Sequence, residues 1–279
     1  MSRVLIHSSR EIEEMRASCE LAADTLVMIG EHLRPGITTA EINTLVHDYT
    51  LAHKARPATL GYRGYPASVC TSVNEVVCHG IPGEQVLKDG DIINVDVTSI
   101  LPDVPNGWHG DTSATYYVGE PSPEARHVVE VARRCLEIGV SMVKPEVRLG
   151  DIGAAIQEYA ESRGCSVVRE YTGHGIGRVF HAEPSVRHYG KVGTGVRLKK
   201  GMTFTIEPMI NLGRKEIFHL DDDWTVLTRD RSLSAQFEHT VVVTRSGVDV
   251  LTKRRAPLTN SEDKPWADLG PVTCFTPEP

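Results

Sequence analysis

Four acidic residues each stand alone in a run of apolar and β-favouring residues, where a free carboxylate is out of place. They are Asp96 in 92–98, Asp111 in 109–113, Glu207 in 201–209 and Glu238 in 235–243. Burying an unpaired charge costs more free energy than one strand can return, so each acid must be neutral, salt-bridged or bound to a metal. For one acid alone a salt bridge is the commoner explanation, but four together favour a metal.

His174, in the glycine-rich segment 172–177, adds an imidazole to this set of candidate ligands. Four carboxylates over-neutralise one divalent ion, whereas two ions carry four positive charges and can share bridging acids such as Asp111 and Glu238. Two such ions also lower the pKa of a bridging water to about 7, which creates a nucleophile at neutral pH. The donors suit manganese, iron(II), cobalt(II) or zinc and do not distinguish among them. The five residues predict a hydrolytic dinuclear metal site.

Helices and strands must position these ligands. Capping-box spacing and apolar periodicity predict helices that begin after Ser8 and Thr38, and a helix opens again at Ser122-Pro123. A strand is expected to end at Asp96 and the next to run from Thr112 to Val118. These elements form an α/β protein.

The order of the elements repeats within the chain. Segment 34–42 resembles 144–152, and 87–96 resembles 198–207, so the offset is 110 between Pro35 and Pro145 and 111 between Asp96 and Glu207. Such a repeat indicates an internal duplication. It predicts two facing halves, about 10–118 and about 122–252, with Asp96 and Glu207 at related places around a shared site.

Composition restricts the class of protein. The 279 residues suit one compact domain, 1–252, followed by a tail, 253–279, whose proline and charge predict a surface or disordered segment. No stretch is apolar enough to span a membrane or to serve as a signal peptide, so we expect a cytoplasmic protein. Six cysteines without a C-x-x-C pair suggest reduced thiols. A net charge of -7 argues against nucleic acid as the main ligand, and a monomer is expected.

The ligand-bearing strings resemble those of the bacterial type I methionine aminopeptidases. The similarity runs from about Ile12 to Thr252 and includes 94–98, 109–112, 173–177, 204–209 and 236–240. It implies the pitta-bread fold, an α/β (α+β) architecture in which two pseudo-symmetric halves with antiparallel strands surround a dinuclear metal site. It also implies that Asp96 and Asp111 hold one ion, and that Asp111, His174, Glu207 and Glu238 hold the other, with Asp111 and Glu238 shared.

The same resemblance extends to segments 61–70 and 74–82, which are similar to the family's methionine-pocket segments. It implies pocket walls for an unbranched thioether side chain, formed by Tyr62, Tyr65, Cys70, Phe180 and Trp224, with Thr59 where many relatives carry a cysteine. His79 is expected to bond the substrate amide nitrogen, His181 to stabilise the carbonyl oxygen, and Glu207 to move the proton.

The loop between Asp96 and Asp111 departs from the family pattern, and His239 lies next to a predicted ligand without being one. The spacing of 15 between Asp96 and Asp111 is longer than in many relatives, and the extra residues 101–105 should bulge from a hairpin tip because prolines fit poorly in a paired ladder. His239 should point away from Glu238 if Glu238 lies on a strand, and we expect it to be structural.

The implied function is removal of the initiator methionine from nascent chains with a small second residue, through metal-activated hydroxide attack on the first peptide bond. The substrates are nascent N-termini, and a transient ribosome contact is possible for such an enzyme. One alternative is an X-Pro peptidase of the same fold, which usually carries a further N-terminal domain. The other is a non-catalytic ribosome- or peptide-binding protein, in which loss of metal ligands is expected.

Overall fold

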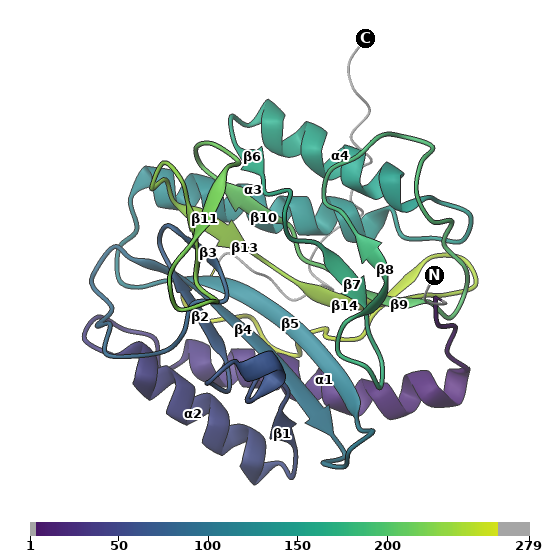
Figure 1. Ribbon diagram of the computed structural model, residues 1–279, viewed down its shortest axis with the longest axis horizontal. Coiled ribbons are helices and arrows are strands. Elements are labelled where there is room, and N and C mark those ends of the chain that lie inside the picture. The colour runs from purple at the N-terminus through teal and green to yellow at the C-terminus, as the bar shows by residue number, and fades with distance from the viewer. Residues whose placement is uncertain (1–3, 262–279) are drawn as a thin grey trace.

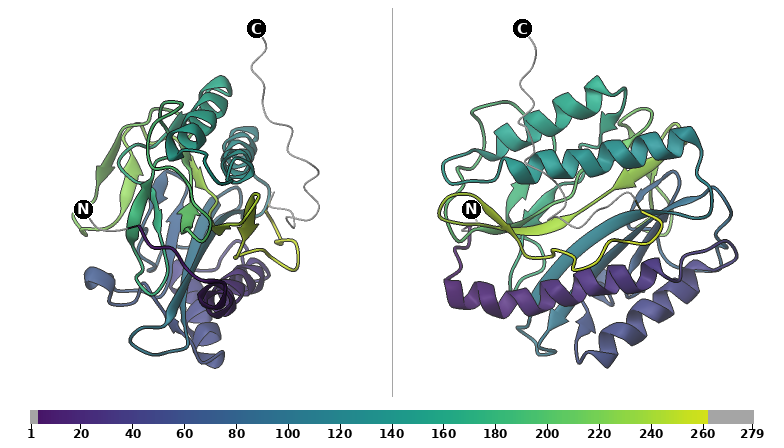
Figure 2. Two further views of the ribbon diagram at one scale, coloured as in Figure 1. Left: turned by 90° about the vertical axis from the view of Figure 1, so that its right-hand side faces the viewer. Right: turned by 180° about the vertical axis from the view of Figure 1, so that it is seen from behind.

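A computed structural model describes residues 4–261 (Figure 1). The first half holds α1 (Ser9–Gly30), α2 (Thr39–Ala52), β1 (Arg56–Pro57), the 3-10 turn η1 (Tyr62–Gly64), β2 (Cys70–Val73), β3 (Val76–Cys78), β4 (Ile92–Leu101) and β5 (Trp108–Tyr117). The second holds α3 (Pro123–Ser141), α4 (Leu149–Ser162), β6 (Ser166–Val167), β7 (Gly173–Gly175), β8 (Ala182–Val186), β9 (Thr203–Ile206), β10 (Met209–Asn211), β11 (Ile217–His219), β12 (Val226–Thr228), β13 (Ser234–Gln236), β14 (His239–Val243) and β15 (Val248–Val250). Helices α1 and α2 lie along one side and α3 and α4 along the other, with the strands between them (Figure 2).

The predicted helix starts are confirmed. Ser8 and Thr38 form capping boxes with Glu11 and Glu41, which satisfies backbone N–H groups at the first turns of α1 and α2. Ser122 caps α3 through the N–H of Ala125. Each helix then buries its apolar face against the strands, and these faces join in one large core.

The duplication is visible in the backbone pairing. Helices α2 and α4 are both 14 residues long and begin 110 positions apart. Strand β1 pairs Arg56 with Ile100, and β6 pairs Ser166 with Asn211, again at offsets of 110 and 111. Because the pairing repeats with the sequence, Asp96 and Glu207 occupy equivalent places in the two halves.

The halves meet along β5 on one side and β13 and β14 on the other. Thr115 donates its hydroxyl to the carbonyl oxygen of Gln236, and Thr240 donates to that of Asp111, both at 2.8 Å. The N–H of Glu238 donates to the carbonyl oxygen of Ser113 at 3.0 Å. All these groups are buried, so the seam fixes the strands that carry Asp111 and Glu238 relative to each other.

The strands differ from the prediction at the acids themselves. Strand β4 continues through Asp96 to Leu101, because β5 pairs with it along its whole length, and residues 102–107 form the expected hairpin tip. In the second half, Glu207 lies between β9 and β10, and Glu238 lies between β13 and β14. The prediction that these two acids lie within strands is therefore wrong.

The breaks at Glu207 and Glu238 have one cause. Strands β9 and β14 belong to the sheet β15-β14-β9-β7-β8, whereas β10 and β13 belong to the sheet β13-β10-β6. The segment from β9 to β10 and the segment from β13 to β14 each pass from one sheet to the other, and they do so at the same level. Pro208 also has no N–H to donate to a continuing strand ladder. Two acids thereby leave the ladders beside each other.

The segment 253–261 lies against the first half. Leu258 joins the main core, and the carbonyl oxygen of Asn260 accepts the N–H of Tyr117 at 2.6 Å. Ser261 donates to the carbonyl oxygen of Thr115 at 2.7 Å. Residues 253–261 therefore lie on the surface of the first half, and the rest of the predicted tail, 262–279, lies outside the described residues. Within 4–261 the five cysteines are free and buried, and no helix is long and apolar enough to cross a membrane.

Helix α1 and strand β5 are in close backbone contact at Gly110, next to Asp111. A Cβ at Gly110 would lie 2.4 Å from the backbone nitrogen of Cys19. We expect Gly110→Ala to lower the free energy of unfolding by about 1–3 kcal/mol, because backbone atoms must move to admit the methyl group. Chemical denaturation measures the loss. Gly247→Ala is the control, since a Cβ there meets nothing within 4 Å, and equal stability of the two variants would contradict the expectation.

Candidate metal centre and substrate cavity

A cavity of about 410 Å³ lies between the two halves. All the predicted site residues line it: Thr59, Tyr62, Tyr65, Cys70, His79, Asp96, Asp111, His174, Phe180, His181, Glu207, Trp224 and Glu238. They come from both halves of the chain, so folding brings together residues up to 179 positions apart. The cavity is also lined by residues that were not predicted site residues: Arg63, Cys78, Thr98, Glu170, Tyr171, Thr172, Met209, Asp223 and Gln236.

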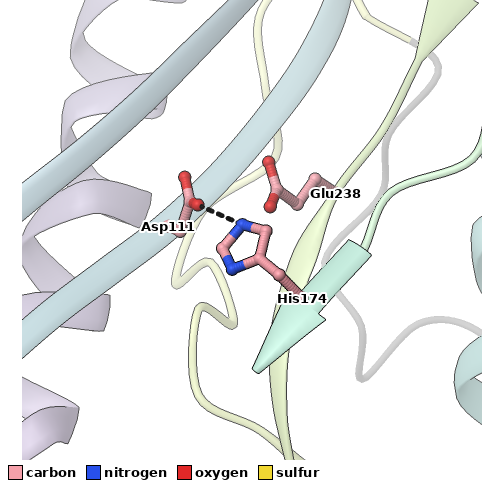
Figure 3. Close-up of side chains that lie close together, drawn as sticks. All are labelled: Asp111, His174 and Glu238. Atoms are coloured by element: carbon pink, nitrogen blue, oxygen red, sulfur yellow. Dashed lines mark ion pairs between the residues drawn. The ribbon is translucent and has the colours of Figure 1, made fainter. Parts of the chain in front are cut away.

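The predicted ligands converge at one end of the cavity. Ligand atoms of Asp111, His174 and Glu238 all lie within 4.8 Å of one another (Figure 3). The Nε2 atom of His174 is 3.4 Å from Oδ2 of Asp111 and 3.6 Å from Oε1 of Glu207. Two atoms that each bind one ion at about 2.1 Å lie about 3.4 Å apart in tetrahedral geometry. The spacing therefore suits a shared cation.

Two carboxylate oxygens support the same conclusion. Oδ1 of Asp96 and Oε1 of Glu238 are buried and have no hydrogen-bond partner among residues 4–261. Burial, followed by the charges of Asp111 and Glu207, raises the pKa of both acids well above the usual range. Burial likewise raises the pKa of Glu207 to about 7. Because a cation would satisfy the oxygens and offset the repulsion, these residues fit divalent metal ions.

Threonine hydroxyls hold the ligands in place. Thr98 pairs with Asp111 across β4 and β5 and donates to its Oδ1 at 2.7 Å. Thr205 donates to Oε1 of Glu207 at 2.6 Å and accepts the N–H of His174 at 3.0 Å. Both threonines stand two positions from a predicted acid, Thr98 after Asp96 and Thr205 before Glu207. Residues two positions apart share a face of a strand, so this spacing is the sequence signal that could have identified both threonines.

Aromatic rings form the wall of the cavity beside the acids. The ring of Tyr62 lies 4.9 Å from Phe180, and its hydroxyl is 2.8 Å from Nδ1 of His181. On the other side, Trp224 is 5.1 Å from Tyr65 and 6.0 Å from His79. Such a wall suits an apolar side chain with a polarisable sulfur.

His79 and His181 stand at the same cavity, as expected for groups that contact a peptide. Burial lowers the pKa of His79 to about 4 and that of His181 to about 3. Neutral imidazoles can each donate one hydrogen bond without adding charge beside the acids. By contrast His239, expected to be structural, is buried away from the cavity lining with its Nδ1 2.9 Å from the hydroxyl of Thr252.

Carboxylates and an imidazole at the end of a peptide-sized cavity define a metal-dependent hydrolase. Residues 13–245 match the metallopeptidase family M24, and this chain belongs to that family. Methionine aminopeptidase A of Synechocystis sp. is 54% identical over 89% of this chain and 97% of its own length. Methionine aminopeptidase of Escherichia coli K12 is 52% identical over 90% and 95%. The predicted resemblance to the bacterial type I methionine aminopeptidases is confirmed.

Solved structures agree with this placement. The crystal structure of methionine aminopeptidase from Rickettsia prowazekii superposes with a TM-score of 0.87 at 51% identity, covering 90% of this chain and 100% of that chain. The prolidase from Pyrococcus horikoshii reaches a TM-score of 0.70 at 20% identity, and the match covers 65% of that longer chain. The pitta-bread fold is thus confirmed, and prolidases share the fold alone.

Proposed function

We propose that the chain is a methionine aminopeptidase that removes the initiator methionine from nascent proteins whose second residue is small. The observation that carries this proposal is the cavity, where an aromatic wall suited to a thioether lies directly beside the acids and His174. Relatives at 52–54% identity over most of both chains bear the same name, which supports it.

Two divalent ions are proposed, of manganese, iron(II), cobalt(II) or zinc. Asp96 and Asp111 would hold one, and Asp111, His174, Glu207 and Glu238 the other, with Asp111 and Glu238 shared. When bound, such ions supply a water of lowered pKa and polarise a carbonyl group. The two carboxylate oxygens without partners in the described chain, on Asp96 and Glu238, support this donor set.

The proposed substrate position follows from the cavity lining. The methionine side chain lies among Tyr62, Tyr65, Cys70, Phe180 and Trp224, with Thr59 at the edge of the pocket. His79 then forms a hydrogen bond with the amide N–H of the first peptide bond, and His181 stabilises the carbonyl oxygen as it gains negative charge. Glu207 takes a proton from the attacking water and delivers it to the leaving amine.

The cellular setting is part of the proposal. The substrates are N-termini of nascent chains, the enzyme works in the cytoplasm as a monomer, and its contact with the ribosome is transient. The absence of a membrane-spanning helix among residues 4–261 is compatible with this setting.

A peptide panel tests the proposal. Purified protein loaded with each candidate metal is expected to cleave Met-Ala-Ser and to leave Leu-Ala-Ser, Met-Lys-Ser and X-Pro dipeptides almost untouched. Methionine release is measured by chromatography. Preferential cleavage of X-Pro dipeptides would favour the prolidase alternative. No bound metal and no turnover under any metal would favour a binding protein.

A further inference from the structure

The backbone of Glu207 is held in an unusual way. Strand β9 ends at Ile206 and β10 begins at Met209, so Glu207 lies outside both ladders. Its N–H instead donates to Nε2 of His188 at 3.0 Å, a side chain 19 positions earlier in the sequence. A histidine ring thus accepts the hydrogen bond that a strand would normally accept.

Comparison with the other half shows what the ring replaces. Asp96, the counterpart of Glu207, lies inside β4 and has a strand neighbour on each side, Cys70 on β2 and Ser113 on β5. No such pairing is present for Glu207 in the described strands. His188 therefore supplies from a side chain what β2 and β5 supply to Asp96.

The burial of His188 argues against a role in packing alone. Its ring is 1% exposed, and because the backbone N–H of Glu207 points at Nε2, that nitrogen is an acceptor that carries no proton. Since Nε2 accepts from Glu207, the proton resides on Nδ1. Within residues 4–261 that Nδ1 has no hydrogen-bond partner. A buried polar group with one unmet donor costs stability, and an apolar side chain would avoid that cost.

The segment around His188 is fixed against α4. A Cβ at Gly153 would lie 2.4 Å from the carbonyl oxygen of Tyr189 and 2.7 Å from that of Arg187, so helix and segment touch directly. Gly190 also donates its N–H to Oε1 of Gln157 on α4 at 3.3 Å. The ring of His188 consequently has little freedom to move.

We propose that His188 is a positioning residue: its Nε2 fixes the backbone at the break after β9, and thereby the direction in which the Glu207 carboxylate points. Thr205 and Gln236 hold the carboxylate itself, at 2.6 Å and 3.3 Å, and His188 holds the main chain that bears it. This inference rests on the role proposed for Glu207.

Three variants test the proposal. His188→Leu removes the acceptor, His188→Gln can place Oε1 where Nε2 lies, and His188→Asn places its oxygen at the Nδ1 position, out of reach. We expect the Leu and Asn variants to lose about 10- to 100-fold in kcat with KM within about twofold, and to bind Mn²⁺ about tenfold more weakly. His188→Gln should recover both to within about fivefold.

Calorimetric titration of Mn²⁺ without substrate provides the readout that is independent of turnover, and circular dichroism gives Tm. Ile42→Val, in the core of the first half, controls for a small loss of Tm at a distance from the site. Wild-type kcat and Mn²⁺ affinity in His188→Leu would overturn the proposal. Equal kcat and Mn²⁺ affinity in His188→Gln and His188→Asn would also overturn it, and this comparison is the deciding one if His188→Leu does not fold. Glu207→Gln assayed alongside separates the two ideas, because wild-type turnover there would refute the role of Glu207 instead.

Discussion

Replacing Glu207 with glutamine is expected to lower kcat by about a thousandfold or more while the fold remains intact. Proton transfer by a positioned side chain contributes about 10²- to 10⁴-fold to the rate, and an amide cannot carry the proton. The amide is also a poorer ligand than a carboxylate, so one metal should bind more weakly. Glutamine keeps the size of the side chain and can still bond Thr205, which is why we expect the fold to persist.

Steady-state cleavage of Met-Ala-Ser, metal content per chain and the far-ultraviolet dichroism spectrum measure these effects. Glu170→Gln is the matched control, because Glu170 is an exposed acid that lines the same cavity outside the proposed ligand set. That control should retain near-wild-type turnover. Glu207 would be removed from the proposed site if its glutamine variant turned over like the wild type.

Asp96→Asn is expected to change activity and metal-free stability in opposite directions. Loss of a ligand should reduce turnover at least about a hundredfold and lower the metal content. In the metal-free protein, however, Asp96 is half-buried with its Oδ1 fully buried, and the charges of Asp111 and Glu207 repel its carboxylate. Neutralising it should stabilise that form by about 1–2 kcal/mol, which raises Tm by a few degrees.

The sign of the pH dependence follows from the same repulsion. Because the pKa of Asp96 is raised in the folded state, the folded protein binds this proton more tightly than the unfolded chain does. The contribution of Asp96 to the free energy of unfolding therefore falls as the pH rises from the ordinary aspartate pKa toward the raised one. The advantage of Asp96→Asn in a chelator should therefore grow from pH 5 to pH 8 in thermal scans. Asp48→Asn, at an exposed acid on α2, should show no such gain. A lower Tm for Asp96→Asn at every pH would contradict the expectation.

The sequence was sufficient to single out five candidate ligands, because four of them are acids out of place within their own segments and because duplication left matching strings about 110 positions apart. It was insufficient where tertiary pairing decides. Segments 201–209 and 235–243 each look like one strand, and only the change of sheet interrupts them at Glu207 and Glu238. Pro208 was the local sign of the first break.

Two further features left no periodic signal. Leu258 is a single buried apolar residue in a polar stretch, so its packing depends on a site formed by distant parts of the chain. His188 resembles any loop histidine until the end of β9 is located, because its partner is a backbone group created by that break. Residues that serve another residue's main chain are therefore the hardest to infer from sequence.

The distribution of the proposed ligands over both halves bears on how the protein matures. Asp96 and Asp111 belong to the first half, and His174, Glu207 and Glu238 to the second, the last of them 41 positions before the end of the chain. A partly translated chain thus lacks a complete centre, however well its first half has folded.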